Sequence, residues 1–176
     1  MTQMESIVRI ATMRDYQEVL RLFLQSHQEN GQFSLAPDKL HWLLSRLLAP
    51  EAIPEDDMGL RGIIGVIGKE GALEAICGVC ISDLWYTHEK HLGDFLVFVD
   101  PEHRHTEHAK TLITWMKLQA DIIGIPLMSG VVTNHRTEAK CRLFRRMYPK
   151  VGELFLYQPM EYKLTAGSSR SNLTAH

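Results

Sequence analysis

The fold is decided by residues 91–121, which read HLGDFLVFVDPEHRHTEHAKTLITWMKLQAD. Leu92–Val99 is apolar and rich in β-branched and aromatic side chains, and Asp100-Pro101 ends this predicted strand. Thr106 is the predicted N-cap of the helix that follows, with Glu107 in its first turn. Apolar residues then recur at helical spacing, at Ala109, Leu112, Ile113, Met116, Ala120 and Ile123. A strand that leads straight into a helix presents free N–H groups and a positive dipole end, which together favour an anion.

The rest of the chain predicts alternating strands and helices. The elements predicted before the deciding stretch are an edge strand at Ile7–Ile10, a helix from Thr12 to Asn30, a helix from Pro37, and a hairpin of Gly62–Gly68 with Leu73–Leu84. Those predicted after it are an interior strand at Pro126–Val132, a helix from Asn134 or Thr137 to Met147, and strands at Leu154–Tyr157 and Met160–Leu164. This order predicts an α+β fold in one domain over residues 1–164, with a disordered polar tail over 165–176.

Composition limits the classes of function. The 176 residues are 45% hydrophobic and 23% charged, as in an ordinary soluble globular domain. The net charge of −2 gives no general attraction to nucleic acid or to an anionic membrane, so neither is an expected partner. A basic run from Arg136 to Lys150 is interpreted as a solvated helix face. No apolar run reaches the length of a membrane span, and three cysteines favour a reducing, cytoplasmic location.

The strand end and loop at Val99–Arg104 resemble those of the GNAT superfamily of acyl-CoA-dependent N-acyltransferases. In that family the next turn reads Arg/Gln-x-x-Gly-x-Gly/Ala, and its amides hold the pyrophosphate of coenzyme A. Arg104 and Ala109 fit this pattern here, whereas Glu107 takes the place of the middle glycine. The resemblance implies a mixed, mostly antiparallel central sheet flanked by helices. It also implies that acetyl-CoA is bound by Arg104, His105, Thr106, Glu107, His108 and Ala109.

The resemblance implies positions for the acyl group on the same strand. By position, the main-chain amides of Phe98 and Val99 would polarise the thioester carbonyl, beside a bulge where the family's strand splays from its neighbour. Asp94 is the candidate general base, because family members often use a carboxylate on this strand. The alternatives are an ordinary buried strand and a solvated aspartate at its start.

Two further positions follow from the family's last helix. Its pattern Leu-Tyr-x-x-x-Gly-Phe is matched by Leu143 to Pro149, so that Phe144 takes the place of the tyrosine that protonates the leaving thiolate. Tyr148 lies one turn further on and is the candidate acid, with packing at the helix end as the alternative. Asn134 matches an asparagine that contacts the pantetheine arm, and an N-cap is its alternative.

The histidines and cysteines suggest two other functions, metal binding and redox chemistry. His88, His91, His103, His105 and His108 are dense enough for a zinc site, but no cysteine or carboxylate has the companion spacing of a metal motif. We therefore expect solvated histidines and no metal. The Cys77–Cys80 segment matches a redox Cys-x-x-Cys motif, yet it lies inside a predicted strand, where residues three apart face opposite sides. Two buried structural cysteines are the preferred interpretation.

The sequence thus predicts an N-acetyltransferase of the GNAT type. Acetyl-CoA would be the cosubstrate, and a primary amine on a small molecule or a protein would attack it directly in a ternary complex. The alternative is a GNAT-fold binding or structural protein without the chemistry, since Glu107 and Phe144 replace a glycine and a tyrosine of the family pattern. A homodimer is compatible with the family, although no interface is visible in the sequence.

Overall fold

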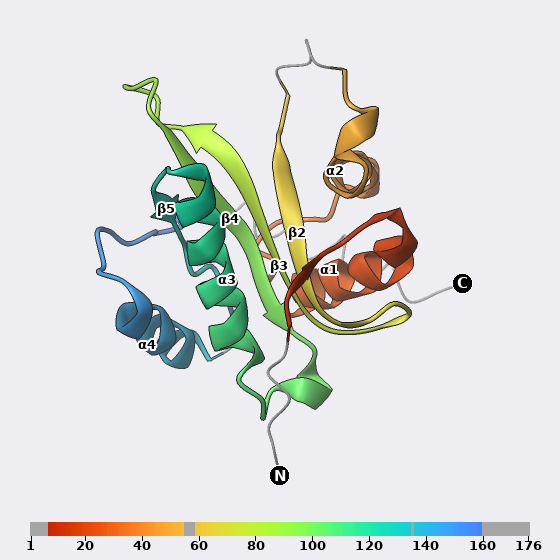
Figure 1. Ribbon diagram of the computed structural model, residues 1–176. Coiled ribbons are helices and arrows are strands. Elements are labelled where there is room, and N and C mark those ends of the chain that lie inside the picture. Colours follow the sequence, from red (N-terminus) through yellow and green to blue (C-terminus); the bar gives the residue numbers. More distant parts are fainter. Residues whose placement is uncertain (1–6, 55–58, 135, 160–176) are drawn as a thin grey trace.

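The computed structural model describes residues 7–54, 59–134 and 136–159. Nine main elements follow one another along the chain (Figure 1): β1 (Arg9–Ile10), α1 (Tyr16–Asn30), α2 (Pro37–Leu48), β2 (Gly62–Lys69), β3 (Ala72–Asp83), β4 (Lys90–Val99), α3 (His108–Ile123), β5 (Leu127–Met128) and α4 (Thr137–Met147). Three short 3-10 helices connect them: η1 (Met13–Asp15), η2 (Pro50–Ala52) and η3 (Pro101–His103). The predicted order of strands and helices is confirmed from β1 to α4.

The described strands form one mixed sheet of five, in the order β1-β2-β3-β4-β5. The first four pair antiparallel, while β5 runs parallel to β4 and pairs only Leu127 with Leu92 and Met128 with Gly93. The predicted α+β class with a mostly antiparallel sheet is therefore confirmed. The sheet has helices on both faces, with α3 covering the face opposite α1 and α2 (Figure 1).

Two predictions for the C-terminal part are wrong. Pro126–Val132 is not an interior strand, because pairing with β4 stops after Met128 and β5 lies at the sheet edge. After Met128, the N–H of Gly130 donates to the carboxylate of Asp94 at 3.0 Å. In a strand that continued to pair with β4, this N–H would instead donate to a backbone carbonyl. Leu154–Tyr157 has no strand structure and its side chains are largely exposed. The strand predicted at Met160–Leu164 lies outside the described residues.

Two apolar cores explain why the sheet takes helices on both faces. The core under α1 and α2 contains Leu22, Leu44, Ile64, Ile76 and Phe98, all buried. The core under α3 contains Cys77, Leu92, Leu112, Ile113 and Met116. Neighbouring residues of β3 and β4 enter opposite cores because strand side chains alternate between faces. Burying both faces of the sheet stabilises the domain chiefly by removing these side chains from water.

A β-bulge interrupts β4 at Phe95. Gly78 of β3 pairs with Leu96, and the next residue, Val79, pairs with Asp94, so that Phe95 is left without a partner. The Phe95 ring lies over Gly78, where a Cβ atom would be 2.2 Å from its Cζ. Glycine at position 78 is thus what allows the ring to occupy this place. The bulge separates the part of β4 that pairs with both β3 and β5 from the part that, among the described strands, pairs with β3 only.

Candidate acyl-transfer site

The candidate site lies where β5 ends and β4 continues with β3 as its only paired strand among the described residues. At the far end of β4, the N–H of Asp100 donates to the carbonyl of Glu74 at 2.9 Å, on the β3 side. Because successive N–H groups of a strand alternate in direction, the N–H of Phe98 also points to β3. Those of Val97 and Val99 point to the side on which β5 has ended. Of the two amides predicted for the acyl group, the structure places Val99 on the open side and Phe98 on the paired side.

Asp94 lies one residue before the bulge, at the point where the two strands separate. Its Oδ1 accepts the N–H of Gly130 at 3.0 Å. Burial raises the pKa of Asp94 to about 6, against the smaller opposing effects of the Gly130 N–H and the nearby Ser129 hydroxyl. A carboxyl group with a pKa near neutrality exchanges protons readily at physiological pH, as a general base must. The alternative of a solvated strand-end aspartate is inconsistent with this burial.

Tyr148 approaches the same place from the end of α4. Its ring makes an edge-on contact with Phe144, with 5.9 Å between the ring centroids. Burial raises the pKa of Tyr148 to about 12, with a smaller contribution in the same direction from the charge of Asp94 and an opposing effect of the Ser129 hydroxyl. The phenol therefore stays protonated at physiological pH and can act only as an acid. The structure thus brings together the two side chains predicted for catalysis, which lie 54 positions apart in the sequence.

Ser129 is a residue of this site that sequence reasoning missed. It follows β5 directly and affects the pKa of both Asp94 and Tyr148. The Ser129 Oγ and the Tyr148 Oη are nevertheless buried without a hydrogen bond of acceptable geometry to any described residue. Nothing in the apolar pattern of 126–132 distinguishes a functional serine from one that ends a strand. Only the early end of β5 places its hydroxyl between the other two groups.

The predicted phosphate turn runs from η3 into the first turn of α3. Helix α3 begins at His108 with Glu107 as N-cap, so the predicted N-cap at Thr106 is wrong by one residue. Thr106 still supports the turn, because its Oγ1 accepts the N–H of His108 at 3.3 Å and donates to the carbonyl of His103 at 2.6 Å. Glu107 has φ −84°, which any residue adopts, and its carboxylate lies 3.6 Å from Lys110 Nζ in solvent. A glutamate at the glycine position is therefore compatible with this turn.

The two histidines of the turn have different surroundings. His105 is exposed, whereas His108 is buried and its Nε2 lies 2.6 Å from Glu74 Oε2. His103 stacks on the His108 ring with 6.2 Å between centroids. The expectation of solvated histidines is wrong for His108, because its side chain turns back against β3. Within the described ranges, no three histidine, cysteine, aspartate or glutamate side chains are grouped as metal ligands.

Arg104 is held beneath the turn by α1. Its Nη2 pairs with Glu29 Oε2 at 2.5 Å, its Nε donates to the Val99 carbonyl at 3.2 Å, and its guanidinium lies over the Phe98 ring. Lys140 of α4 reaches the other oxygen of Glu29 at 3.7 Å, and burial lowers its pKa. Two cations thus flank one carboxylate next to the open side of β4. Lys140 differs in this from the solvated helix face that was predicted for the basic run.

Asn134 connects the segment before α4 to the loop after α1. Its Oδ1 accepts the amide of Gln32 at 2.6 Å, and its Nδ2 donates weakly to the Gly31 carbonyl at 3.5 Å. The N-cap of α4 is Arg136, so the alternative reading of Asn134 as an N-cap is wrong. Phe144 packs against the core under α3 and against the ring of Tyr148.

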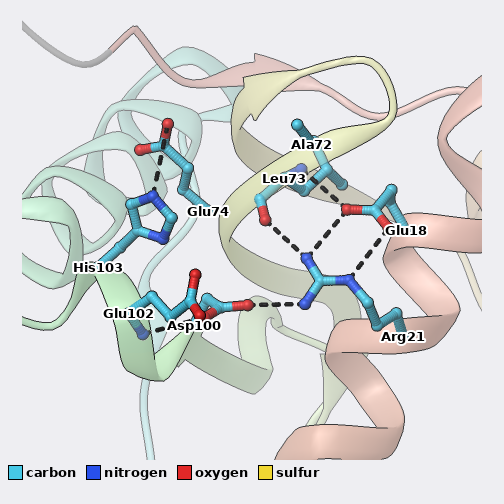
Figure 2. Close-up of a pocket in the computed structure, with 8 residues that line it drawn as sticks. All are labelled: Glu18, Arg21, Ala72, Leu73, Glu74, Asp100, Glu102 and His103. Atoms are coloured by element: carbon cyan, nitrogen blue, oxygen red, sulfur yellow. Dashed lines mark hydrogen bonds and ion pairs between the residues drawn. The ribbon is translucent and has the colours of Figure 1, made fainter.

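A cavity of about 300 Å³ lies where β4 ends, beside Asp100. Figure 2 shows Arg21 of α1 at its centre, bonded to Glu18, to Asp100 Oδ2 at 2.6 Å and to the Leu73 carbonyl at 2.8 Å. Burial alone would raise the pKa of Asp100, but Arg21 and the N–H of Glu102 together outweigh it and hold the pKa below its ordinary value. Arg21 thus joins α1 to the ends of β3 and β4 and fixes the start of the phosphate turn.

Among solved structures, acetyltransferases share this fold at low sequence identity. A possible acetyltransferase from Clostridium difficile 630 is 20% identical, with a TM-score of 0.63 over 88% of this chain and 97% of that one. A ribosomal-protein-alanine N-acetyltransferase from Brucella melitensis biovar Abortus 2308 is 16% identical, with a TM-score of 0.59 over 86% and 99%. AAC(6')-Iy, solved with the bisubstrate analogue CoA-S-monomethyl-acetylneamine, is 12% identical, with a TM-score of 0.64 over 88% and 98%.

No family model matches the sequence, and no curated protein matches it either. None of the helices in the described part of the chain is long and apolar enough to cross a membrane. The structural likeness extends over most of both chains in each comparison, which is more than the residues around β4 and α3 that carry the sequence resemblance. The prediction from those residues is confirmed: the chain has the GNAT fold.

Proposed function

We propose that this protein is an acyl-CoA-dependent N-acyltransferase that transfers an acetyl group to a primary amine by direct attack in a ternary complex. The observation that carries the proposal is the meeting of Asp94 and Tyr148 where β5 leaves β4. Burial gives one a pKa of about 6 and the other a pKa of about 12, which suits a base and an acid acting at the same pH. The GNAT fold of the structural neighbours supports the same class of reaction.

The turn from Arg104 to Ala109 would hold the coenzyme pyrophosphate. It opens a helix of 16 residues, whose N-terminus carries free N–H groups and a positive dipole end. Arg104 and Lys140 add positive charge nearby, while the Glu107 side chain points to solvent and pairs with Lys110. The backbone of His105, Thr106 and His108 completes the turn. These residues fit an anionic ligand, and Asn134 and Phe144 would border its pantetheine arm.

Acetyl-CoA would supply a thioester carbonyl and a thiolate leaving group. The amides of Val97 and Val99, on the open side of β4, would stabilise the negative charge on the carbonyl oxygen. The Asp94 carboxylate would accept the proton of the attacking ammonium, and Tyr148 would give its proton to the departing sulfur. We assign Val97 in place of Phe98, because the N–H of Phe98 points to β3, whereas the N–H of Val97 points to the open side of β4. The proposed setting is the cytoplasm, with a small-molecule or protein amine as acceptor.

Isothermal titration with acetyl-CoA tests the first half of this proposal, beside a Glu107→Gly variant and an exposed control, Glu138→Gln. We expect the native chain to bind at micromolar concentration and the Glu107→Gly variant to bind a few-fold more tightly. Release of free thiol from acetyl-CoA in the presence of a panel of primary amines then tests the transfer. Binding only after Glu107→Gly would favour a GNAT-fold binding protein. A folded chain that binds in neither form would contradict the proposed function.

A further inference from the structure

Ser129 is placed where it can exchange protons with both catalytic groups. It lies between Met128, the last residue of β5, and Gly130, whose N–H is fixed on Asp94 Oδ1 at 3.0 Å. A serine hydroxyl donates one hydrogen bond and accepts two, so it can serve a carboxylate and a phenol together. Its influence on the pKa of both Asp94 and Tyr148 shows that it is near each of them.

The hydroxyls of Ser129 and Tyr148 are both buried without a well-formed hydrogen bond to a described residue. Leaving a buried hydroxyl in this condition lowers stability, so two such hydroxyls in one site require an explanation. The thiols of Cys77 and Cys80 on β3 have no hydrogen bond to either hydroxyl. Burial first, and then the charge of Asp94, raise the pKa of Cys77 and of Cys80, and both remain neutral.

We propose that Ser129 is a proton relay between Asp94 and Tyr148, a role that rests on the proposed function. Attack of a neutral amine forms the C–N bond, and Asp94 accepts the ammonium proton. Cleavage of the C–S bond releases a thiolate, which takes the proton of Tyr148. Ser129 then accepts the proton of the Asp94 carboxyl and donates its own to the Tyr148 phenolate. Both groups return to their starting forms, and the cycle neither gains nor loses a proton.

The test compares Ser129→Ala and Ser129→Thr with Ser45→Ala, which removes an exposed hydroxyl of α2. The titration of the Asp94 carboxyl is followed by carbon-13 NMR, with Asp94→Asn for assignment, and the transfer rate is measured in parallel. We expect Ser129→Ala to raise the titration midpoint of Asp94 and to lower kcat about tenfold or more, with KM for acetyl-CoA unchanged. Ser129→Thr, which keeps the hydroxyl, should restore both, and Ser45→Ala should change neither.

The two readouts separate the relay from the proposed function. A native chain that fails to bind acetyl-CoA overturns the function, and the relay with it. A native chain that transfers acetyl groups, with kcat or the Asp94 midpoint unchanged in Ser129→Ala, overturns the relay alone. A loss of kcat that threonine does not restore also overturns it, since a packing defect rather than the missing hydroxyl would then be the cause.

Discussion

Asp94, at the bulge in the middle of β4, and Asp100, just after its last residue, are polar groups under opposite conditions. At Asp100, Arg21 bonds two carboxylates and a carbonyl, and the pKa of Asp100 is held below its ordinary value. At Asp94, a carboxyl and a phenol are buried with few partners, and the pKa of each is raised. The paired charges around Arg21 stabilise the fold. The groups with few partners, Asp94 and Tyr148, lower its stability, and their raised pKa values are typical of groups that exchange protons. One strand and the residue that follows it thus contain both a scaffold and a reactive site.

The largest effect should follow from Asp94→Asn, which removes the base from the reactive site. We expect acetyl transfer to fall by about 10²-fold or more, because general base catalysis contributes on that order. The exposed Asp121→Asn of α3 is the matched control and should leave the rate unchanged. A rate within a few-fold of the native value would show that Asp94 is not the base and would remove the contrast between Asp94 and Asp100.

The same substitution should make the protein more stable at alkaline pH. The pKa of Asp94 is about 6 in the folded protein and 3.8 in the unfolded chain, so folding binds a proton between these values. Its contribution to the free energy of unfolding therefore falls as pH rises from about 4 to about 6, and stays low above that. We expect the stability gained through Asp94→Asn to be about 2 kcal/mol larger at pH 8 than at pH 4.5, where the folded carboxyl is still protonated. Urea unfolding at both pH values measures this, and equal differences would contradict the raised pKa.

Around Asp100, Arg21→Met should lower stability. The substitution leaves Glu18 and Asp100 without their shared cation, and we expect a loss of about 2 kcal/mol, less than for a fully buried pair because Arg21 is partly exposed. Arg14→Met, an exposed arginine of η1, is the matched control for urea unfolding. An unchanged unfolding midpoint in Arg21→Met would mean that these ion pairs do not hold the ends of β3 and β4.

The smallest effect concerns the bulge between Asp94 and Asp100. Gly78→Ala would place a methyl group against the Phe95 ring, which must move outward, and we expect a loss of about 1 kcal/mol. Gly93→Ala on the neighbouring strand β4 would meet only a His91 atom at 3.9 Å and serves as control. In a double-mutant cycle, Phe95→Ala should relieve part of the cost of Gly78→Ala. Strictly additive losses would show that ring and glycine are not coupled.

The sequence predicted the helices and strands whose local pattern of residues is compatible with only one type of secondary structure. Amphipathic spacing located α1, α2, α3 and α4, and the turn at Lys69-Glu70-Gly71 located the hairpin of β2 and β3. The early end of β5 could not be predicted, because the apolar run in 126–132 suits a long interior strand equally well. The decisive contact, Asp94 with Gly130, joins residues 36 positions apart and is invisible to local patterns.

The sequence predicted which residues belong to the candidate site, but not how they lie relative to one another. Asp94 and Tyr148 were identified through the resemblance to a family, and their common burial follows only from the packing of α4 against α3 and the core beneath it. Phe98 was chosen by position, and Val97 was missed, because N–H direction depends on the register with β3. Arg104 was expected to face an anion, yet its partner Glu29 comes from a helix 75 positions earlier. Ion pairs between residues far apart in the sequence determine how the side chains of the site are oriented, and a short sequence motif cannot predict them.

The bond from Gly130 to Asp94 also limits which carboxylic acid this position can carry. The side chain has to be short enough to meet the Gly130 N–H at 3.0 Å while its other oxygen stays available for a proton. Glutamate has nearly the same acidity, but its extra methylene would push the chain after β5 away from β4 and widen the gap proposed to receive the thioester. The length of this side chain therefore sets the width of the opening, and two acids of nearly equal strength are not equivalent here.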